Sequence, residues 1–369
     1  MKIKGKSYRT ICLDRENNFV RIINQNLLPH DFKLQNLTNL KDVCNAISDM
    51  NVRGAPLIGV TAASGVWLAM CKDQSDKSLI NACKALQSTR PTAVNLEVSL
   101  NYMKNKLFFT NVSERKNEAF LAVQNLIEED VLNCSLIGLH GLNILKNLLN
   151  ENSKQKLNVL THCNAGWLAC VDWGTALAPI YKAHDSGIPI HVWVDETRPR
   201  NQGAFLTTWE LEQHGVPHTL ITDNAGGHIM QKGLVDVCIV GSDRTTRHGD
   251  VCNKIGTYLK ALAAFDNNIP FYVALPTSTI DNVTKNNADF EIEERDPKEI
   301  LYVKGKDIDG KINSVSIAPD GTNAINYAFD ITPSRYIKGL ITEKGVCNST
   351  NEDINILLNK KIRKKIYEK

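Results

Sequence analysis

The chain has 369 residues, of which 43% are hydrophobic and 22% charged, and its formal net charge is +3. These are ordinary globular values, so wholesale disorder is excluded, and the length favours two domains over a single core. The small net charge does not indicate nucleic-acid binding, and we expect no segment apolar for long enough to span a bilayer. Residues 1–6 lack the apolar core of a signal peptide, and the ten cysteines contain no Cys-x-x-Cys pair. We therefore expect a soluble, reduced, cytoplasmic protein without a disulfide framework.

The N-terminal part is predicted to be mainly helical after a short strand-like start at residues 10–13 and 19–23. Residues 37–50 carry apolar side chains at helical spacing, and residues 58–71 are apolar on nearly every side, as in a buried helix. Residues 114–149 are helical in spacing and low in proline, and we expect them to contain the passage between domains. The predicted domains are residues 1–130 and 131–369, the second ending in a tail from about residue 348.

From residue 157 onward, strand-like and helical segments alternate. Glycine or asparagine ends each helix and an Ile-Pro or Val-Pro pair opens the next strand at three of these junctions. This alternation predicts an α/β fold, with a Rossmann-like parallel sheet covered by helices on both faces. The predicted strands are residues 157–162, 189–195, 217–222, 236–241 and 269–275, with a possible sixth near 314–318. No Gly-x-Gly-x-x-Gly follows the first strand, so a dinucleotide cofactor is not expected.

Two reactive side chains follow buried strands of this sheet, at the edge where open parallel sheets bind ligands. Cys163 lies one residue beyond its strand, at a predicted helix start, where a thiol pKa would be lowered; the alternative is a small buried core residue. Asp243 ends another strand and could act as a general acid if burial raises its pKa. The alternatives for Asp243 are a helix cap or an ion pair with Arg244. Asp250 is the better cap candidate, because it precedes a helix predicted to start near Val251.

Several basic and amide side chains lie at element boundaries. Arg53 precedes a helix start where backbone amides and a guanidinium could together bind a phosphate. The number of basic side chains at such boundaries favours a phosphorylated small molecule as the ligand, although each of them alone would be interpreted as a surface charge. The candidates are Arg53 with Gly54 and Ala55, Arg90, Asn253, Lys254, and Gln202, which could bind sugar hydroxyls. The histidines lack ligand spacing, because His162 adjoins Cys163 and His228 and His248 lie in separate loops, so no metal and no cofactor are predicted. Trp173 and Trp193 are predicted to be core residues.

Ordered motifs between residues 52 and 346 resemble the methylthioribose-1-phosphate isomerase family of methionine salvage. The motifs are Arg53-Gly-Ala-Pro56, Arg90-Pro-Thr-Ala-Val-Asn-Leu96, Thr161-His-Cys-Asn-Ala-Gly166, Asp195-Glu-Thr-Arg-Pro-Arg-x-Gln-Gly203, Gly241-x-Asp-Arg244, Gly249-Asp-Val-x-Asn-Lys-Ile-Gly-Thr257 and Ala328-Phe-Asp-Ile-Thr-Pro333. Any one of them would be weak alone, whereas seven in order are specific.

The resemblance implies an aldose–ketose isomerisation of a small sugar 1-phosphate, with neither nucleic acid nor membrane as partner. It assigns Asp243 as proton donor and Cys163 as its partner at the C1–C2 transfer. The substrate-binding residues that it implies are Arg53, Gly54, Ala55, Arg90, Gln202, Asn253 and Lys254. The resemblance also implies a homodimer.

Several positions depart from the family pattern, and they leave alternatives open. Arg247 and His248 add charge near Asp243, which leaves the substrate's C5 substituent undecided among methylthio, hydrogen and a second phosphate. Trp167, Tyr327 and Val98 also differ from the usual residues. The rival enzymes would act on 5-deoxyribose 1-phosphate or ribose 1,5-bisphosphate. A rival of another class is a regulatory alpha, beta or delta subunit of the translation-initiation guanine-nucleotide exchange factor. The basic tail, residues 360–365, is interpreted as a solvated terminus.

Overall fold

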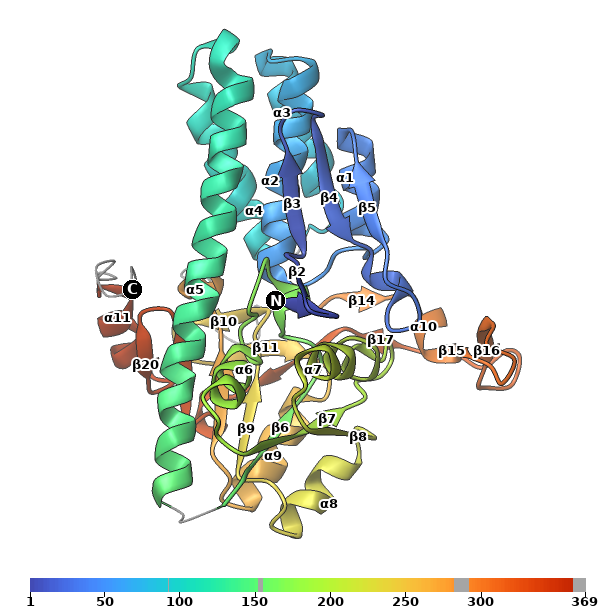
Figure 1. The fold of residues 1–369 in the computed structure, drawn as a ribbon, viewed down its shortest axis with the longest axis vertical. Helices are drawn as coiled ribbons and strands as arrows, with labels where there is room; N and C mark the ends of the chain where they lie inside the picture. The colour runs from blue at the N-terminus through green and yellow to red at the C-terminus, as the bar shows by residue number, and fades with distance from the viewer. Residues whose placement is uncertain (92, 152–154, 282–291, 361–369) are drawn as a thin grey trace.

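The computed structural model describes residues 1–91, 93–151, 155–281 and 292–360 (Figure 1). Its N-terminal half is mainly helical, as predicted, with a small antiparallel sheet in the order β3-β4-β5 along one side. Helix α2 lies at the centre of this half and packs against the other helices. The elements are β1 (Lys2–Ile3), β2 (Lys6–Ser7), β3 (Ile11–Asp14), β4 (Phe19–Ile23), β5 (Leu34–Leu37), α1 (Leu40–Ser48), α2 (Ala55–Lys72), α3 (Asp76–Gln87), α4 (Val94–Phe108) and α5 (Arg115–Glu151).

Capping side chains define where two of these helices begin. The Asn39 side chain accepts a hydrogen bond from the backbone N–H of Asp42 at the start of α1, and Ser75 does the same for Ser78 at the start of α3. Helix α2 instead begins after Gly54 and carries proline in its first turn. These starts follow from the local sequence.

Helix α2 corrects one expectation. By length and composition it could cross a membrane, with a mean hydropathy of 1.3 over its 18 residues, although no such segment was expected. In the structure, 78% of this span is buried inside the protein. Its apolar character on all sides therefore follows from its central position among α1, α3, α4 and α5.

A seven-stranded sheet forms the centre of the C-terminal half, in the order β20-β19-β12-β9-β6-β7-β8. All neighbours are parallel except β20, which pairs antiparallel with β19 at the edge. The five predicted strands are confirmed within one or two residues. The strands are β6 (Leu157–Thr161), β7 (Ile190–Asp195), β8 (His218–Ile221), β9 (Val237–Val240), β12 (Phe271–Ala274), β19 (Gly339–Thr342) and β20 (Gly345–Cys347).

Helices cover both faces of this sheet. Successive residues of a strand point to opposite faces, so neighbouring residues pack in different cores. Val159 packs in the core shared with α5, α6 and α7, whereas its neighbour Leu160 packs in the core shared with α8, α9 and α11. Ile239 and Val240 divide in the same way. These helices are α6 (Ala178–Asp185), α7 (Thr208–His214), α8 (Ala225–Gln231), α9 (Thr257–Asp266) and α11 (Asn351–Leu358).

A second sheet, in the order β13-β10-β11-β18, lies beyond the carboxyl end of β9. Its strands are β10 (Arg244–Thr246), β11 (Val251–Lys254), β13 (Ile280–Asp281) and β18 (Phe329–Thr332). The helix predicted near Val251 was wrong, because this segment pairs on both edges as β11 and the helix α9 begins only at Thr257. Asp250 is consequently not a helix cap, and its carboxylate accepts a hydrogen bond from the backbone N–H of Ser334, at 2.8 Å.

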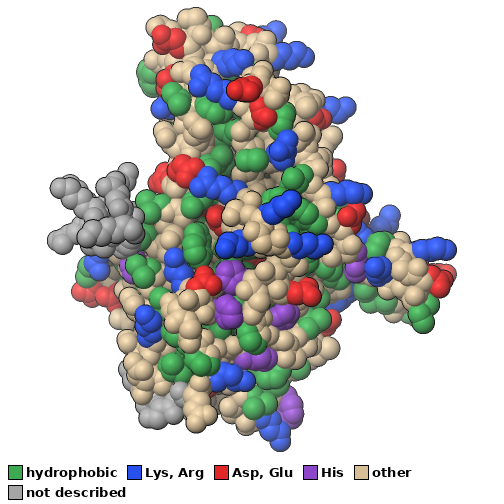
Figure 2. Space-filling view, in the orientation of Figure 1, with side chains coloured by type: hydrophobic (Ala, Val, Ile, Leu, Met, Phe, Trp, Pro, Cys, Tyr) green, Lys and Arg blue, Asp and Glu red, His purple; other side chains and the backbone are tan. Residues whose placement is uncertain are grey.

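The predicted sixth strand was placed wrongly. Residues 312–316 do form a strand, β16 (Ile312–Ser316), but it pairs with β15 (Tyr302–Lys306) in a hairpin that projects from the body (Figures 1 and 2). The sheet is extended instead by β19. The short α10 (Lys298–Leu301) precedes this hairpin, and β14 (Glu294–Arg295) pairs with β17 (Asn326–Tyr327). On the face drawn in Figure 2, acidic and basic side chains are interspersed.

Helix α5 runs along both halves of the molecule (Figure 1). Its residues Val123 and Ile127 belong to the N-terminal core, whereas Ile137 and Leu145 belong to the core beneath the parallel sheet. The change from one core to the other falls close to residue 130, where the domain boundary was predicted. Trp173 and Trp193, predicted as core residues, are half-buried and pack against the core clusters.

Candidate active site

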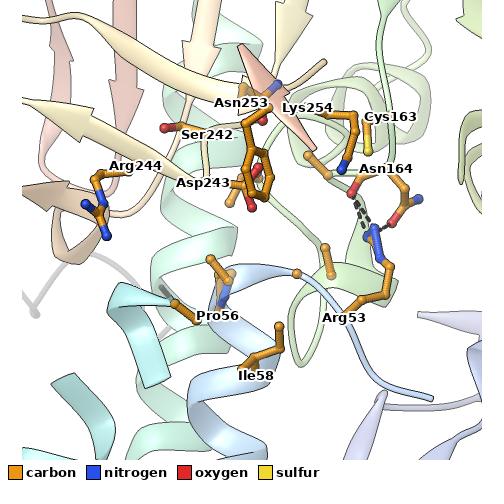
Figure 3. Close-up of a pocket in the computed structure, with 18 of the residues that line it drawn as sticks. Arg53, Pro56, Ile58, Cys163, Asn164, Ser242, Asp243, Arg244, Asn253 and Lys254 are labelled. Atoms are coloured by element: carbon orange, nitrogen blue, oxygen red, sulfur yellow. Dashed lines mark hydrogen bonds between the residues drawn. The ribbon is translucent and has the colours of Figure 1, made fainter. Parts of the chain in front are cut away.

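A cavity of about 130 Å³ lies where the start of α2 meets the carboxyl ends of β6 and β9 and the strand β11 (Figure 3). All nine residues predicted for the site contribute to its lining, although they come from distant parts of the chain. They are Arg53, Gly54, Ala55, Arg90, Cys163, Gln202, Asp243, Asn253 and Lys254. The structure therefore brings together all of the predicted catalytic and substrate-binding residues, while the role of each one stays a prediction.

Cys163 occupies a left-handed backbone conformation, with φ of 65°. Two threonine hydroxyls hold this conformation: the N–H of Cys163 donates to Thr197 at 2.8 Å, and Thr207 donates to the Cys163 carbonyl at 2.6 Å. The expected helix start was wrong, because the next helical turn is a short 3-10 segment at Trp167–Ala169. Cys163 therefore does not lie at the start of a helix of its own segment.

The environment of the Cys163 thiol has two opposing effects. Burial raises its pKa, whereas the nearby charges of Arg53 and Lys254 lower it, and burial is the larger effect. The thiol donates a hydrogen bond to the Gln202 side-chain oxygen at 3.2 Å. The Cys163 thiol therefore keeps its proton to a higher pH than a free cysteine, although Arg53 and Lys254 act against this shift.

Asp243 follows β9 and enters the second sheet, where its N–H donates to the Cys252 carbonyl at 3.0 Å. Burial raises the pKa of its carboxyl, although the charges of Lys254, Arg90 and Arg53 act in the opposite direction. The alternative of an ion pair between Asp243 and Arg244 is not found. Instead, Nη1 of Arg244 lies 3.7 Å from the carboxylate of Asp281, and the Arg244 side chain extends away from Asp243 in Figure 3. A carboxyl that keeps its proton to higher pH is suited to act as a general acid.

Arg53 is almost fully buried and is held by Asn164 (Figure 3). Its Nη1 donates to the Asn164 carbonyl at 2.8 Å, and its Nη2 donates to that carbonyl at 2.6 Å and to the side-chain oxygen at 2.5 Å. The Asn164 amide donates in turn to the buried carboxylate of Glu210 at 2.9 Å. Burial lowers the pKa of Arg53. Its Nε has no protein partner among the described residues, so a donor remains for a ligand.

Sequence reasoning assigned no role to Asn164 or Glu210. Asn164 lies inside the quoted motif beside Cys163, so a signal existed for it. Glu210 lies within α7, where its sequence neighbours give no sign that its carboxylate also accepts hydrogen bonds from the backbone of Trp167 and Leu168. Contacts of this kind between distant segments are visible only in the fold.

Arg90 and Lys254 line the same cavity as Arg53. Arg90 forms an ion pair with Glu293 at 3.0 Å, which the sequence did not predict. The Lys254 amine donates to the Ala328 carbonyl at 2.9 Å and lies 4.6 Å from the centre of the Phe329 ring. Burial lowers the pKa of Lys254, and the neighbouring Cys163 and Asp243 act against this shift. Lys254 lies in a strand, not at the helix start predicted for it.

The remaining substrate-binding candidates shape the cavity through the backbone or through buried amides. Gly54 has φ of 90°, and a Cβ there would lie 2.4 Å from the Ala169 carbonyl oxygen, so only glycine fits. Asn253 is buried and its amide donates to the Thr257 hydroxyl at 3.0 Å. Gln202 is buried as well.

The positions that depart from the family pattern lie away from this cavity. Arg247 and His248 are exposed on the turn between β10 and β11 and are not among the residues that line it. The charge expected near Asp243 is therefore supplied by other side chains. Trp167 is buried in the core, whereas Val98 and Tyr327 are exposed.

Within the part of the chain that the structure describes, two groups of side chains have a spacing that could suit a metal ion: His162 with Asp195 and Asp223, and Asp130 with Cys134 and Cys170. In the first group, His162 already bonds to Asp195 and to a backbone carbonyl. The prediction that no metal is required stays a prediction.

Comparison with known proteins gives the family. Residues 51–349 match the model of the initiation factor 2 subunit family, and the chain belongs to this family. Within it, the chain is 57% identical to methylthioribose-1-phosphate isomerase of Rhodospirillum rubrum over 353 residues, which cover 94% of this chain and 90% of that protein.

Two solved structures are also similar over nearly the whole length. The 5-methylthioribose 1-phosphate isomerase of Pyrococcus horikoshii aligns with a TM-score of 0.83 and 37% identity over 96% of each chain. The translation initiation factor eIF-2B subunit delta of A. fulgidus aligns with a TM-score of 0.80 and 39% identity, covering 95% of this chain and 99% of that one. The fold class predicted from sequence is confirmed.

Proposed function

We propose that this chain is an aldose–ketose isomerase that converts 5-methylthioribose 1-phosphate to 5-methylthioribulose 1-phosphate, as a step of methionine salvage. The relatives that match nearly the full length carry the isomerase name. The observation that carries the proposal is the cavity itself, in which a carboxyl of raised pKa and a half-buried thiol share the lining with the cationic side chains of Arg53, Arg90 and Lys254.

The phosphate of the substrate is bound at the start of α2. This helix has 18 residues, and the positive end of its dipole favours an anion there. Arg53 adds its unpartnered Nε, and Gly54 lets the backbone approach closely because it has no Cβ. Arg90, Asn253 and Gln202 supply further polar groups around the same space.

The phosphate at C1 locks the sugar ring, so the ring must open before the carbonyl can move. Asp243 donates a proton to the ring oxygen as its bond to C1 breaks. In the net reaction C2 loses its hydrogen and C1 gains one, and the ring oxygen becomes a hydroxyl. The C2 hydroxyl gives up its proton as it becomes a carbonyl, and this proton restores the Asp243 carboxyl. Cys163 acts at this C1–C2 transfer, next to the charge of Lys254. Burial of the site supports the scheme, because it raises the pKa of Asp243 and so lets the carboxyl keep its proton to a higher pH.

The assembly and surroundings of the protein belong to the same proposal. We expect a homodimer in the cytoplasm, with two domains that divide near residue 130 of α5, where the core clusters change. No cofactor, nucleic acid or membrane takes part in the proposed reaction.

A regulatory role in translation initiation is the second candidate, favoured by the similarity to the A. fulgidus structure named as an initiation factor subunit. Two observations favour catalysis over regulation. Both Cys163 and Asp243 are present and face one cavity, and Lys254 lies close enough to influence the pKa of each.

The test is proton and phosphorus NMR of the purified protein with 5-methylthioribose 1-phosphate, alongside 5-deoxyribose 1-phosphate and ribose 1,5-bisphosphate. We expect the methylthio sugar to be converted to its ketose fastest. Turnover of the bisphosphate alone would refute the proposed substrate. A folded protein that converted none of the three would favour the regulatory role.

A further inference from the structure

The proposed active site is divided between two sheets. Cys163 follows β6 of the seven-stranded sheet, whereas Asn253 and Lys254 end β11 of the second sheet. The separation between the thiol and the Lys254 amine therefore depends on how these two sheets are held together at the cavity.

His162 connects the two sheets at this point. It immediately precedes Cys163, and its ring Nε2 donates to the carbonyl of Ile255, directly after Lys254, at 2.8 Å. Its Nδ1 lies 2.8 Å from the carboxylate of Asp195 at the end of β7. The side chains of His162 and Asp195 are fully buried, so these contacts are protected from water.

The turn after Lys254 is built to accept the ring. Gly256 has φ of 101°, and a Cβ there would lie 3.0 Å from Cε1 of His162, so the glycine permits close approach. On its other side, the Asp330 carboxylate accepts hydrogen bonds from the N–H groups of Gly256 at 2.7 Å and Tyr258 at 3.1 Å. The turn is thus clamped between His162 and Asp330.

We propose that His162 is a positioning residue, which braces the turn 254–256 against β6 and so fixes Lys254 relative to Cys163 during turnover. This inference rests on the proposed isomerase function. It gives a role to Asp195, Gly256 and Asp330, which occur in three separate motifs and which the reaction scheme does not use.

Direct acid–base catalysis by His162 is the competing interpretation, since the ring lines the cavity beside Cys163. Both ring nitrogens are already engaged, however. A carbonyl oxygen can only accept, so Nε2 carries a hydrogen that is committed to Ile255, and Nδ1 is committed to Asp195. Neither nitrogen is left to exchange a proton with a ligand.

Two substitutions separate the two contacts of the ring. In His162→Gln the amide nitrogen takes roughly the place of Nε2 and can still reach Ile255. In His162→Asn it takes roughly the place of Nδ1 and can reach only Asp195. The variants are compared with the unchanged protein in kcat and KM, with circular dichroism as a check on folding.

We expect His162→Gln to keep kcat within about threefold, and His162→Asn to lose roughly 10- to 100-fold in kcat with little change in KM, since a small misplacement of a catalytic group has such effects. A second readout does not need substrate. The charge of Lys254 lowers the pKa of the Cys163 thiol, so alkylation of Cys163 by iodoacetamide, followed by peptide mass spectrometry, should slow in His162→Asn alone.

Normal kcat in His162→Asn would overturn the proposal, and so would an equal loss in both variants. If His162→Asn does not fold, Gly256→Ala tests the same contact, because its Cβ would push against the ring. It should lower kcat with little change in KM, and unchanged kcat would overturn the brace. Should the unchanged protein convert no substrate, the proposed function fails, while the alkylation rates still decide whether His162 holds Lys254 near Cys163.

Discussion

Replacing Asp243 by asparagine should separate activity from stability. The amide keeps the size of the side chain and cannot donate the proton that opens the ring. General acids contribute roughly 100- to 10,000-fold to rate, so kcat should fall by that factor, which corresponds to about 3–5 kcal/mol of transition-state stabilisation. KM should change much less, because the phosphate is proposed to bind at the start of α2 and not at Asp243. The assay is the NMR conversion of 5-methylthioribose 1-phosphate.

The stability of the same variant should move in the opposite direction. Burial raises the folded-state pKa of Asp243 above its unfolded value, so its stabilising contribution is complete at low pH and is lost as pH rises through the folded pKa. Asparagine removes this dependence, and the variant should unfold in urea at an equal or higher concentration than the unchanged protein at neutral pH. For the same reason, kcat of the unchanged protein should fall as pH rises above the raised pKa, and this limb should be missing in the variant.

Asp250→Asn is the matched control, because Asp250 lies on the same β10–β11 hairpin but outside the cavity lining. Its kcat should stay within about threefold of the unchanged protein, as for a substitution that touches no reacting group. If Asp243→Asn kept kcat within tenfold of the unchanged protein, Asp243 would not be the proton donor.

Three further substitutions test the cavity. Arg53→Lys should raise KM roughly tenfold or more with a smaller effect on kcat. The reason is that lysine lacks the planar guanidinium, which can bind Asn164 and the proposed phosphate together. An unchanged KM and unchanged inhibition by inorganic phosphate would contradict this. Gly54→Ala should lower the free energy of unfolding by about 3 kcal/mol or more, and Gly215→Ala, also at positive φ but with open space around it, by only about 1 kcal/mol; urea denaturation compares the two. Arg247→Ala should leave the kinetics of all three sugar phosphates unchanged, because its side chain lies outside the cavity, and a selective loss of bisphosphate turnover would show otherwise.

The sequence predicted the parallel sheet well, because buried strands and helices give strong and different apolar patterns. The prediction from the sequence failed in the small second sheet, whose strands are short. Residues 251–254 were assigned to the start of a helix with Asp250 as its cap, yet they pair with both β10 and β18. A pairing between segments about 75 residues apart leaves no local signal at either one.

The sequence predicted which residues form the site better than it predicted how those residues are arranged. Cys163 was expected to gain reactivity from a helix terminus, whereas the structure holds it in a left-handed turn between two threonines. Its hydrogen bonds come from residues more than 30 positions away along the chain, in segments that lie beyond the ends of β7. Reactive residue types at strand ends could be recognised from the sequence, but the partners that hold them could not.

The similarity to both isomerase and initiation-factor structures shows that the backbone alone does not separate the two functions, since the TM-scores are 0.83 and 0.80. Function must then depend on side chains, because sites and not folds determine chemistry. A subunit that only binds a partner has no need for a carboxyl whose pKa is raised by burial, with a thiol facing the same cavity and Lys254 influencing both. Such a carboxyl lowers the stability of the fold as the pH rises through its raised pKa. Its retention is explained if Asp243 must carry a proton to the sugar ring.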